Sequence, residues 1–191
     1  MPITISEAMK LDRLKSFRII AGERGINKEI DKIGILDYEI IENIDSQFGI
    51  GDFVLTSFTA ARNDVNLLIR SVGSLIKSKV SGLAIKNIYY KELPHEVIEL
   101  ANEKSFPIFI FDSVYFEDII TDIMDAIKEK DNYELLETKV DKIIKKNISK
   151  VMVRELALEI NSAFKENFIV AYCKEKNHVN NENIFKLLNR I

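Results

Sequence analysis

Short apolar runs alternate along the first two thirds of the chain with stretches whose apolar residues recur at helical spacing. The runs lie at residues 17–21, 33–36, 53–55, 83–85 and 107–111. Apolar runs this short, bounded by glycine, proline or polar residues, are typical of strands that are buried on both faces. Their alternation with helices predicts an α/β domain with a parallel or mixed sheet and flanking helices.

The stretch from Gly49 to Thr59 is the part around which we expect the domain to be organised. Its apolar core, Phe53-Val54-Leu55, follows two glycines and precedes small hydroxyl residues. We therefore predict an interior strand over 53–55.

Helix start signals separate the predicted strands. Thr4 and Glu7 have the spacing of a capping box, which predicts a short helix through Ala8, Met9 and Leu11. Asn63 or Asp64 is expected to cap the next helix, which carries an apolar stripe at Leu68, Val72, Leu75 and Ile76.

The chain changes character after Pro107, the last proline. Apolar residues at helical spacing from Phe116 to Ile144 predict one long helix, or two joined near 131–132, ending around Asn147. Such a helix either packs on its own domain or forms a coiled coil. Ser149 is expected to cap a further helix, followed by a strand at 167–173 and a helix from Ile184, which together resemble a truncated α/β fragment.

Composition narrows the functional classes. An apolar share of 47% and a charged share of 30% are those of a soluble globular protein, and no apolar run could span a membrane. A single cysteine, Cys173, excludes an internal disulfide, so we expect a cytoplasmic protein. Acidic residues outnumber basic ones in residues 1–132, which disfavours direct nucleic-acid binding by that part.

Polar residues that follow the predicted strands are the candidate site. Because ligands of α/β sheets gather at the carboxyl ends of the strands, we expect these side chains to share one edge. They could form a crevice for a small polar ligand or a catalytic set, or the aspartates could simply cap helices. The candidate ligand-binding residues are Asp37, Thr56, Ser57, Thr59, Lys86 and Asp112.

Other familiar chemistry is not expected. Gly49-Ile50-Gly51 precedes a strand, whereas a dinucleotide-binding loop follows one. His95 and His178 lack cysteine or aspartate partners at ligand spacing, so we predict no metal site and no cofactor. Cys173 lies in a strand pattern and is expected to be a small core residue.

The order of these pieces resembles the N-terminal domain of purine catabolism regulator (PucR-like) transcription factors. The resemblance covers residues 3 to about 130. It is carried by Ile19–Gly22 with Gly25, the strand at 33–37, Gly51–Thr56, Ser81–Ile85 and Phe106–Phe109.

The resemblance implies a non-catalytic sensor domain at 1–130 and a helical linker at 131–148. It further implies the start of a GGDEF-like middle domain at 149–191. DNA would be bound only through a C-terminal helix-turn-helix, which is not recognisable in this sequence. The family usually has Thr-Thr-Gly where this chain has Thr56-Ser57-Phe58, and it often has glycine where Lys86 stands. Both departures fall at the candidate site, so the identity of the ligand cannot be transferred.

Three functional hypotheses follow. The first is the ligand-sensing region of a cytoplasmic transcriptional regulator, with a small-molecule effector and no membrane partner. The second is a small α/β enzyme acting on a polar metabolite, and the third is a pure dimerisation module. We also expect a homodimer, because the long apolar stripe and the incomplete second fragment would leave apolar surface uncovered.

Overall fold

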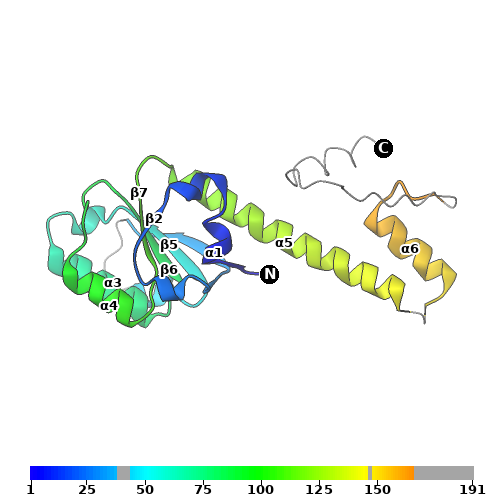
Figure 1. Cartoon of the computed structure of the whole chain (residues 1–191), viewed down its shortest axis with the longest axis horizontal. Coiled ribbons are helices and arrows are strands. Elements are labelled where there is room, and N and C mark those ends of the chain that lie inside the picture. The colour runs from blue at the N-terminus through cyan, green and yellow to red at the C-terminus, as the bar shows by residue number, and fades with distance from the viewer. Residues whose placement is uncertain (38–43, 146–147, 166–191) are drawn as a thin grey trace, which may run out of the picture. The chain divides into compact units, whose positions relative to one another are not determined.

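The computed structural model describes residues 1–37, 44–145 and 148–165, and it divides into two compact units, Met1–Thr138 and Lys139–Ile191 (Figure 1). The first unit is built on a five-stranded sheet in the order β2-β7-β6-β5-β4. The strands are β2 (Arg18–Ala21), β4 (Lys32–Ile35), β5 (Asp52–Thr56), β6 (Gly82–Lys86) and β7 (Ile108–Phe111). The five strands expected for the first domain are therefore present.

The sheet is mixed. Strands β4, β5, β6 and β7 are mutually parallel, whereas β2 pairs with β7 in the antiparallel direction at one edge. The predicted strand over 53–55 lies inside β5, between β4 and β6. This confirms the α/β class and the interior position of Phe53-Val54-Leu55.

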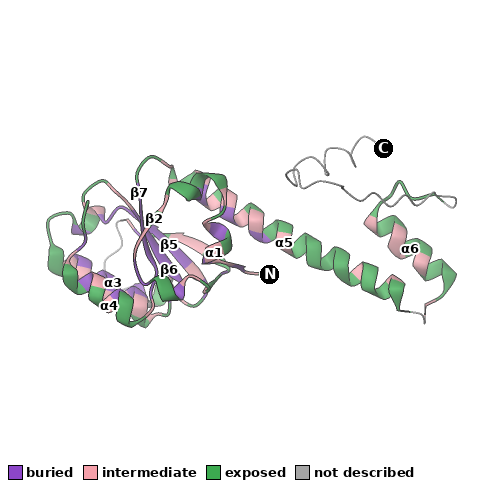
Figure 2. Ribbon diagram, in the orientation of Figure 1, coloured by how far each residue is buried: buried purple, intermediate pink, exposed green. Residues whose placement is uncertain are grey.

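Helices cover both faces of the sheet, and alternate residues of β5 contribute to different cores. Val54 packs in a cluster with residues of α3 (Val65–Lys77) and α4 (His95–Glu103). Phe53 and Leu55 pack in the opposite cluster, with α1 (Ile5–Ala8) and the first half of α5 (Phe116–Ile144). The side chains of Phe53, Val54 and Leu55 are all fully buried, which is why this part of β5 is apolar throughout (Figure 2).

The helix starts follow local hydrogen bonds. The Thr4 hydroxyl accepts a bond of 3.1 Å from the Glu7 amide, and the Glu7 carboxylate accepts one of 2.7 Å from the Thr4 amide. The Asp64 carboxylate caps α3 by accepting a hydrogen bond from the Leu67 amide at 3.0 Å, so the cap is Asp64 and not Asn63. The expected helix through Leu11 is shorter than predicted: α1 ends at Ala8, and a 3-10 helix, η1, covers Asp12–Ser16.

Short elements complete the first unit. Strands β1 (Ile3–Thr4) and β3 (Glu29–Ile30) form a separate antiparallel pair that the sequence did not predict. Two 3-10 turns, η2 (Glu23–Gly25) and η4 (Thr59–Ala61), and the short helix α2 (Ile44–Gln47) connect the strands. Gly22 follows β2 in a left-handed conformation, with a φ of +70°, and a side chain there would collide with the backbone of Phe106.

Helix α5 is a single helix of 29 residues, as one of the two alternatives expected. In the second unit, Ser149 caps helix α6 (Lys150–Ile160) by accepting from the Met152 amide at 3.3 Å. An ion pair of 3.1 Å joins Lys139 and Glu159 within that unit. The strand expected at 167–173 and the helix expected from Ile184 lie outside the described residues. None of the described helices is long and apolar enough to cross a bilayer.

Candidate functional site

The candidate residues follow the carboxyl ends of neighbouring parallel strands. Because β4, β5, β6 and β7 run in the same direction, their carboxyl ends meet at one edge of the sheet. The residues fall into two groups along this edge. The first group follows β4 and β5, and the second follows β6 and β7.

Ser57 is the centre of the first group. Its hydroxyl lies 2.8 Å from the Asp37 carboxylate and 2.6 Å from the Thr59 hydroxyl. The Ser57 amide also donates to Asp37, at 3.1 Å. Ser57 is only 4% exposed, so these contacts hold the loop after β5 against the end of β4.

Thr56 has a structural role in the same group. Its hydroxyl donates to the Leu36 carbonyl and accepts from the Phe58 amide at 2.9 Å. Phe58 has a φ of 52°, which is rare for a residue with a Cβ, so the bond supports an uncommon turn. Because Thr56 is fully buried and its hydroxyl both donates and accepts a hydrogen bond, it stabilises the backbone at this edge of the sheet.

Lys86 defines the second group. Its ammonium nitrogen lies 5.2 Å from the centre of the Tyr115 ring and 5.7 Å from that of Phe116, which is cation–π geometry. Within the described parts of the chain, no carboxylate forms an ion pair with Lys86.

Asn87, the residue after Lys86, forms a hydrogen bond that connects the end of β6 to the end of β7. Its side-chain amide donates to the Asp112 carboxylate at 2.8 Å. Its own carbonyl oxygen is buried and accepts no hydrogen bond from the described residues, which is uncommon for a buried amide. Sequence reasoning missed Asn87, Tyr115 and Phe116, although Asn87 directly follows Lys86 and the two aromatics directly precede or begin α5.

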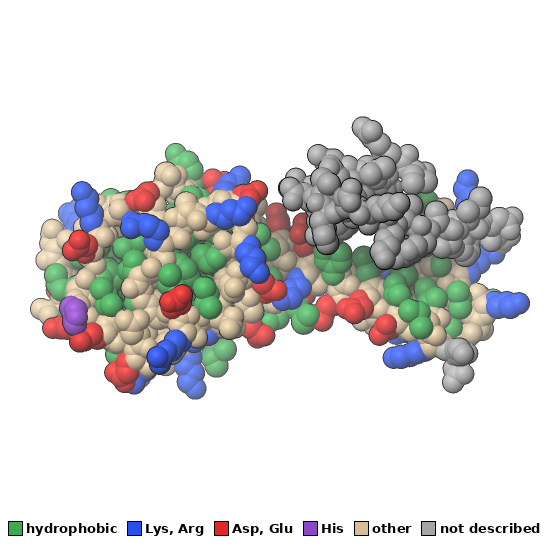
Figure 3. Space-filling view, viewed as in Figure 1, with side chains coloured by type: hydrophobic (Ala, Val, Ile, Leu, Met, Phe, Trp, Pro, Cys, Tyr) green, Lys and Arg blue, Asp and Glu red, His purple; other side chains and the backbone are tan. Residues whose placement is uncertain are grey.

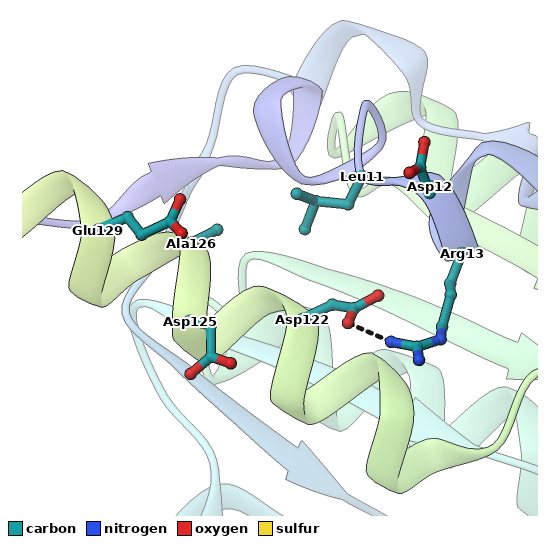
Figure 4. A pocket seen from close by; sticks show the side chains of 7 residues that line it. All are labelled: Leu11, Asp12, Arg13, Asp122, Asp125, Ala126 and Glu129. Atoms are coloured by element: carbon teal, nitrogen blue, oxygen red, sulfur yellow. Dashed lines mark hydrogen bonds and ion pairs between the residues drawn. The ribbon is translucent and has the colours of Figure 1, made fainter. Parts of the chain in front are cut away.

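A surface hollow of about 510 Å³ lies elsewhere, between η1 and α5 (Figure 4). An ion pair between Arg13 and Asp122 crosses it, and Asp125 and Glu129 lie further along α5. Asp12 forms a 2.6 Å ion pair with Lys15, which lowers the pKa of its carboxyl. Over the described residues, no group of histidine, cysteine or acidic side chains could hold a metal ion. Partly neutralised carboxylates of this kind are typical of a solvated surface.

Residues 7–127 match the model of the purine catabolism regulatory protein-like family, so the chain belongs to that family. The match covers the sheet, both helical layers and both groups of edge residues.

One relative is the purine catabolism regulatory protein of Bacillus subtilis (strain 168). It is 24% identical to this chain over 136 residues, which are 70% of this chain and 25% of the relative. The chain therefore spans about a quarter of the length of that relative.

Proposed function

We propose that this chain is the effector-sensing N-terminal region of a cytoplasmic PucR-like transcriptional regulator and has no catalytic activity. Membership of the regulator family over residues 7–127 is the observation that carries this proposal. The polar edge supports it, because open α/β sheets bind ligands outside the carboxyl ends of their strands.

The enzyme hypothesis has less support. Ser57 contacts the Asp37 carboxylate directly, without the imidazole that usually activates a serine nucleophile. Of the two histidines, His95 lies in the described part of the chain; it is exposed on α4, and its ring nitrogen lies 3.5 Å from the Glu99 carboxylate. A nucleophile–base pair is therefore not assembled within the described residues.

Native mass spectrometry of the chain purified from cells tests the sensing function. We expect a small molecule to remain bound in a one-to-one ratio, and unfolding with acid should release it. The absence of any bound molecule, together with a family regulator whose transcriptional output ignores changes in metabolite supply, would contradict sensing and favour a pure dimerisation module.

We further propose that the chain forms a homodimer through its second unit. Exposed apolar side chains gather there, over the end of α5 and over α6 (Figure 3). Three of them, Val140, Leu158 and Phe164, also line an open groove of about 1060 Å³, and exposed apolar surface favours association. The exposed apolar side chains over the end of α5, over α6 and just after it are Val140, Ile144, Val151, Met152, Leu158 and Phe164.

Light scattering on two charged variants tests the dimer. Ile144→Glu and Met152→Glu place a charge on the apolar surface of the second unit, where the native side chains are 68% and 48% exposed. Both should convert a dimer into a monomer. Val65→Glu is the matched control, because Val65 is 51% exposed on α3 in the first unit. A dimer that survives both substitutions would move the interface to another surface.

The remaining organisation follows from the same proposal. Residues 131–148 would link the sensor to a GGDEF-like middle domain beginning at 149. DNA would be bound only through a helix-turn-helix, a motif that is not recognisable in this sequence.

A further inference from the structure

The order of the strands singles out one place along the polar edge. Strands β4, β5, β6 and β7 follow one another in both sequence and space, so successive crossovers run in the same direction. The helices after β5 and β6, α3 and α4, pack in the same core. The helix after β7, α5, packs in the opposite core.

The chain therefore diverges at the β6–β7 boundary. The segment after β6 leads to one face of the sheet, and the segment after β7 leads to the other (Figure 1). In open α/β sheets, neighbouring strands whose connections leave to opposite faces form the crevice in which ligands bind. The first group, around Ser57, lies at β4 and β5, and the described apolar residues that follow both strands, including Leu36, Ile44 and those of α3, pack in the same core.

The side chains at the divergence are suited to an anion that carries a ring. Lys86 is held by two aromatic rings and has no carboxylate partner among the described residues, so its charge is available to a ligand. Tyr115 is 68% exposed, which offers a ring face for stacking. The buried side-chain oxygen of Asn87 accepts no hydrogen bond within the described parts of the chain, and a donor group on a ligand at this edge would satisfy it.

We propose that the β6–β7 divergence, formed by Lys86, Asn87, Asp112, Tyr115 and Phe116, is a binding site for a small planar ring that bears a carboxylate or similar anionic group. Lys86 neutralises the anion, and Tyr115 stacks on the ring. The proposal rests on the proposed sensing function, whose site and ligand class it specifies. It assigns no ligand to the group around Ser57.

Amide correlation spectra of the whole chain titrated with benzoate test this proposal. Benzoate is a minimal planar carboxylate, acetate supplies the charge without the ring, and benzamide supplies the ring without the charge. We expect saturable shifts at the amides of residues 86, 87 and 112–116 with benzoate, and weaker effects with the other two compounds.

Substitutions separate the contributions of charge and ring. Lys86→Gln should weaken benzoate binding by about fivefold or more, and Tyr115→Ala by about threefold to tenfold. Lys10→Gln, at an exposed lysine outside the edge, is the matched control and should leave the affinity unchanged. Thermal melting of each variant shows whether the fold is intact.

The outcomes separate failure of the assigned site from failure of the proposed sensing function. Shifts centred on Asp37, Ser57 or the second unit, or no saturable shifts at all, would overturn the assigned site. A molecule found by native mass spectrometry whose contacts lie elsewhere would leave sensing intact and refute this location alone. Benzoate binding at Lys86 in a protein that carries no molecule from cells would support the site and count against sensing.

Discussion

Replacing Thr56 by valine tests whether the hydroxyl at the end of β5 is structural. Valine has nearly the same shape as threonine but neither donates nor accepts a hydrogen bond. The substitution removes the bond to the Leu36 carbonyl and the bond from the Phe58 amide. Leu36 is 5% exposed and Phe58 is 3% exposed, so water cannot readily replace either lost partner.

The size of the effect follows from these two stranded groups. A buried donor or acceptor left without a partner costs about 1–3 kcal/mol, and the added methyl group of valine offsets part of the total. We expect the free energy of unfolding to fall by about 2–4 kcal/mol. That loss corresponds to a melting temperature lowered by roughly 5–15 °C in a protein of this size.

Two other substitutions make the result specific. Thr56→Ser keeps the hydroxyl and removes one buried methyl group, so it should cost only about 1 kcal/mol. Thr59→Val removes a hydroxyl whose one hydrogen bond within the described residues is to Ser57. Because Ser57 keeps its bond to Asp37, this substitution should cost less than about 1 kcal/mol.

Hydrogen exchange of the slowest amides in β5 and β6 measures this loss within the first unit, whatever the second unit does. A Thr56→Val protein within about 0.5 kcal/mol of the unsubstituted chain, or one no less stable than Thr56→Ser, would refute the reasoning. The hydroxyl would then be free of these bonds in solution and available to a ligand.

Three further substitutions or conditions test the local structure. Asp64→Ala should destabilise the first unit by about 1 kcal/mol through loss of the α3 cap, whereas Asn63→Ala should be nearly neutral in urea unfolding. Gly22→Ala should cost more than about 2 kcal/mol, because alanine would have to adopt a positive φ and would collide with the neighbouring backbone; Gly73→Ala, in open space on α3, should stabilise by about 0.5–1 kcal/mol. Hydrogen bonds from the Thr4 amide and, next in size, from Lys130 lower the pKa of Glu7, so the contribution of its carboxylate to stability is complete above the unfolded pKa of about 4.3 and is lost as the pH falls through the folded pKa. The loss of stability caused by Glu7→Gln should therefore shrink at acidic pH, and a loss independent of pH would contradict this assignment.

The sheet was predictable because its strands are buried on both faces. In β5, β6 and β7, adjacent residues contribute to opposite cores, so the runs are continuously apolar and stand out from the amphipathic helices. The caps at Thr4, Asp64 and Ser149 were also visible, because each depends on a side chain and an amide that are close in sequence.

The elements that escaped prediction depend on distant partners. Strands β1 and β3 are two residues each, too short for any periodicity, and exist because they pair with one another. The antiparallel direction of β2 is likewise set by its pairing with β7, about 90 residues away, and leaves no mark in its own composition.

The candidate site was predictable in position but not in detail. The rule that polar residues follow parallel strands placed the candidates at one edge, yet it could not distinguish Thr56, whose hydroxyl is used internally, from Lys86, which is held by rings. The aromatic partners of Lys86 belong to the connection after the next strand. Only the sheet order brings them together, so no local signal could have paired them.

The apolar stripe of helix α5 does not stay on one face of the helix. Ile119, Ile123 and Ile127 are its buried residues, and burial stops after the last of them (Figure 2). At about 100° per residue, the six steps from Ile127 to Tyr133 turn the helix by roughly 600°, which leaves Tyr133 about 120° away from the buried face. Tyr133 is accordingly 66% exposed. The stripe read from the sequence as continuous therefore changes face beyond Ile127, and its second part cannot be explained by the packing of the first core.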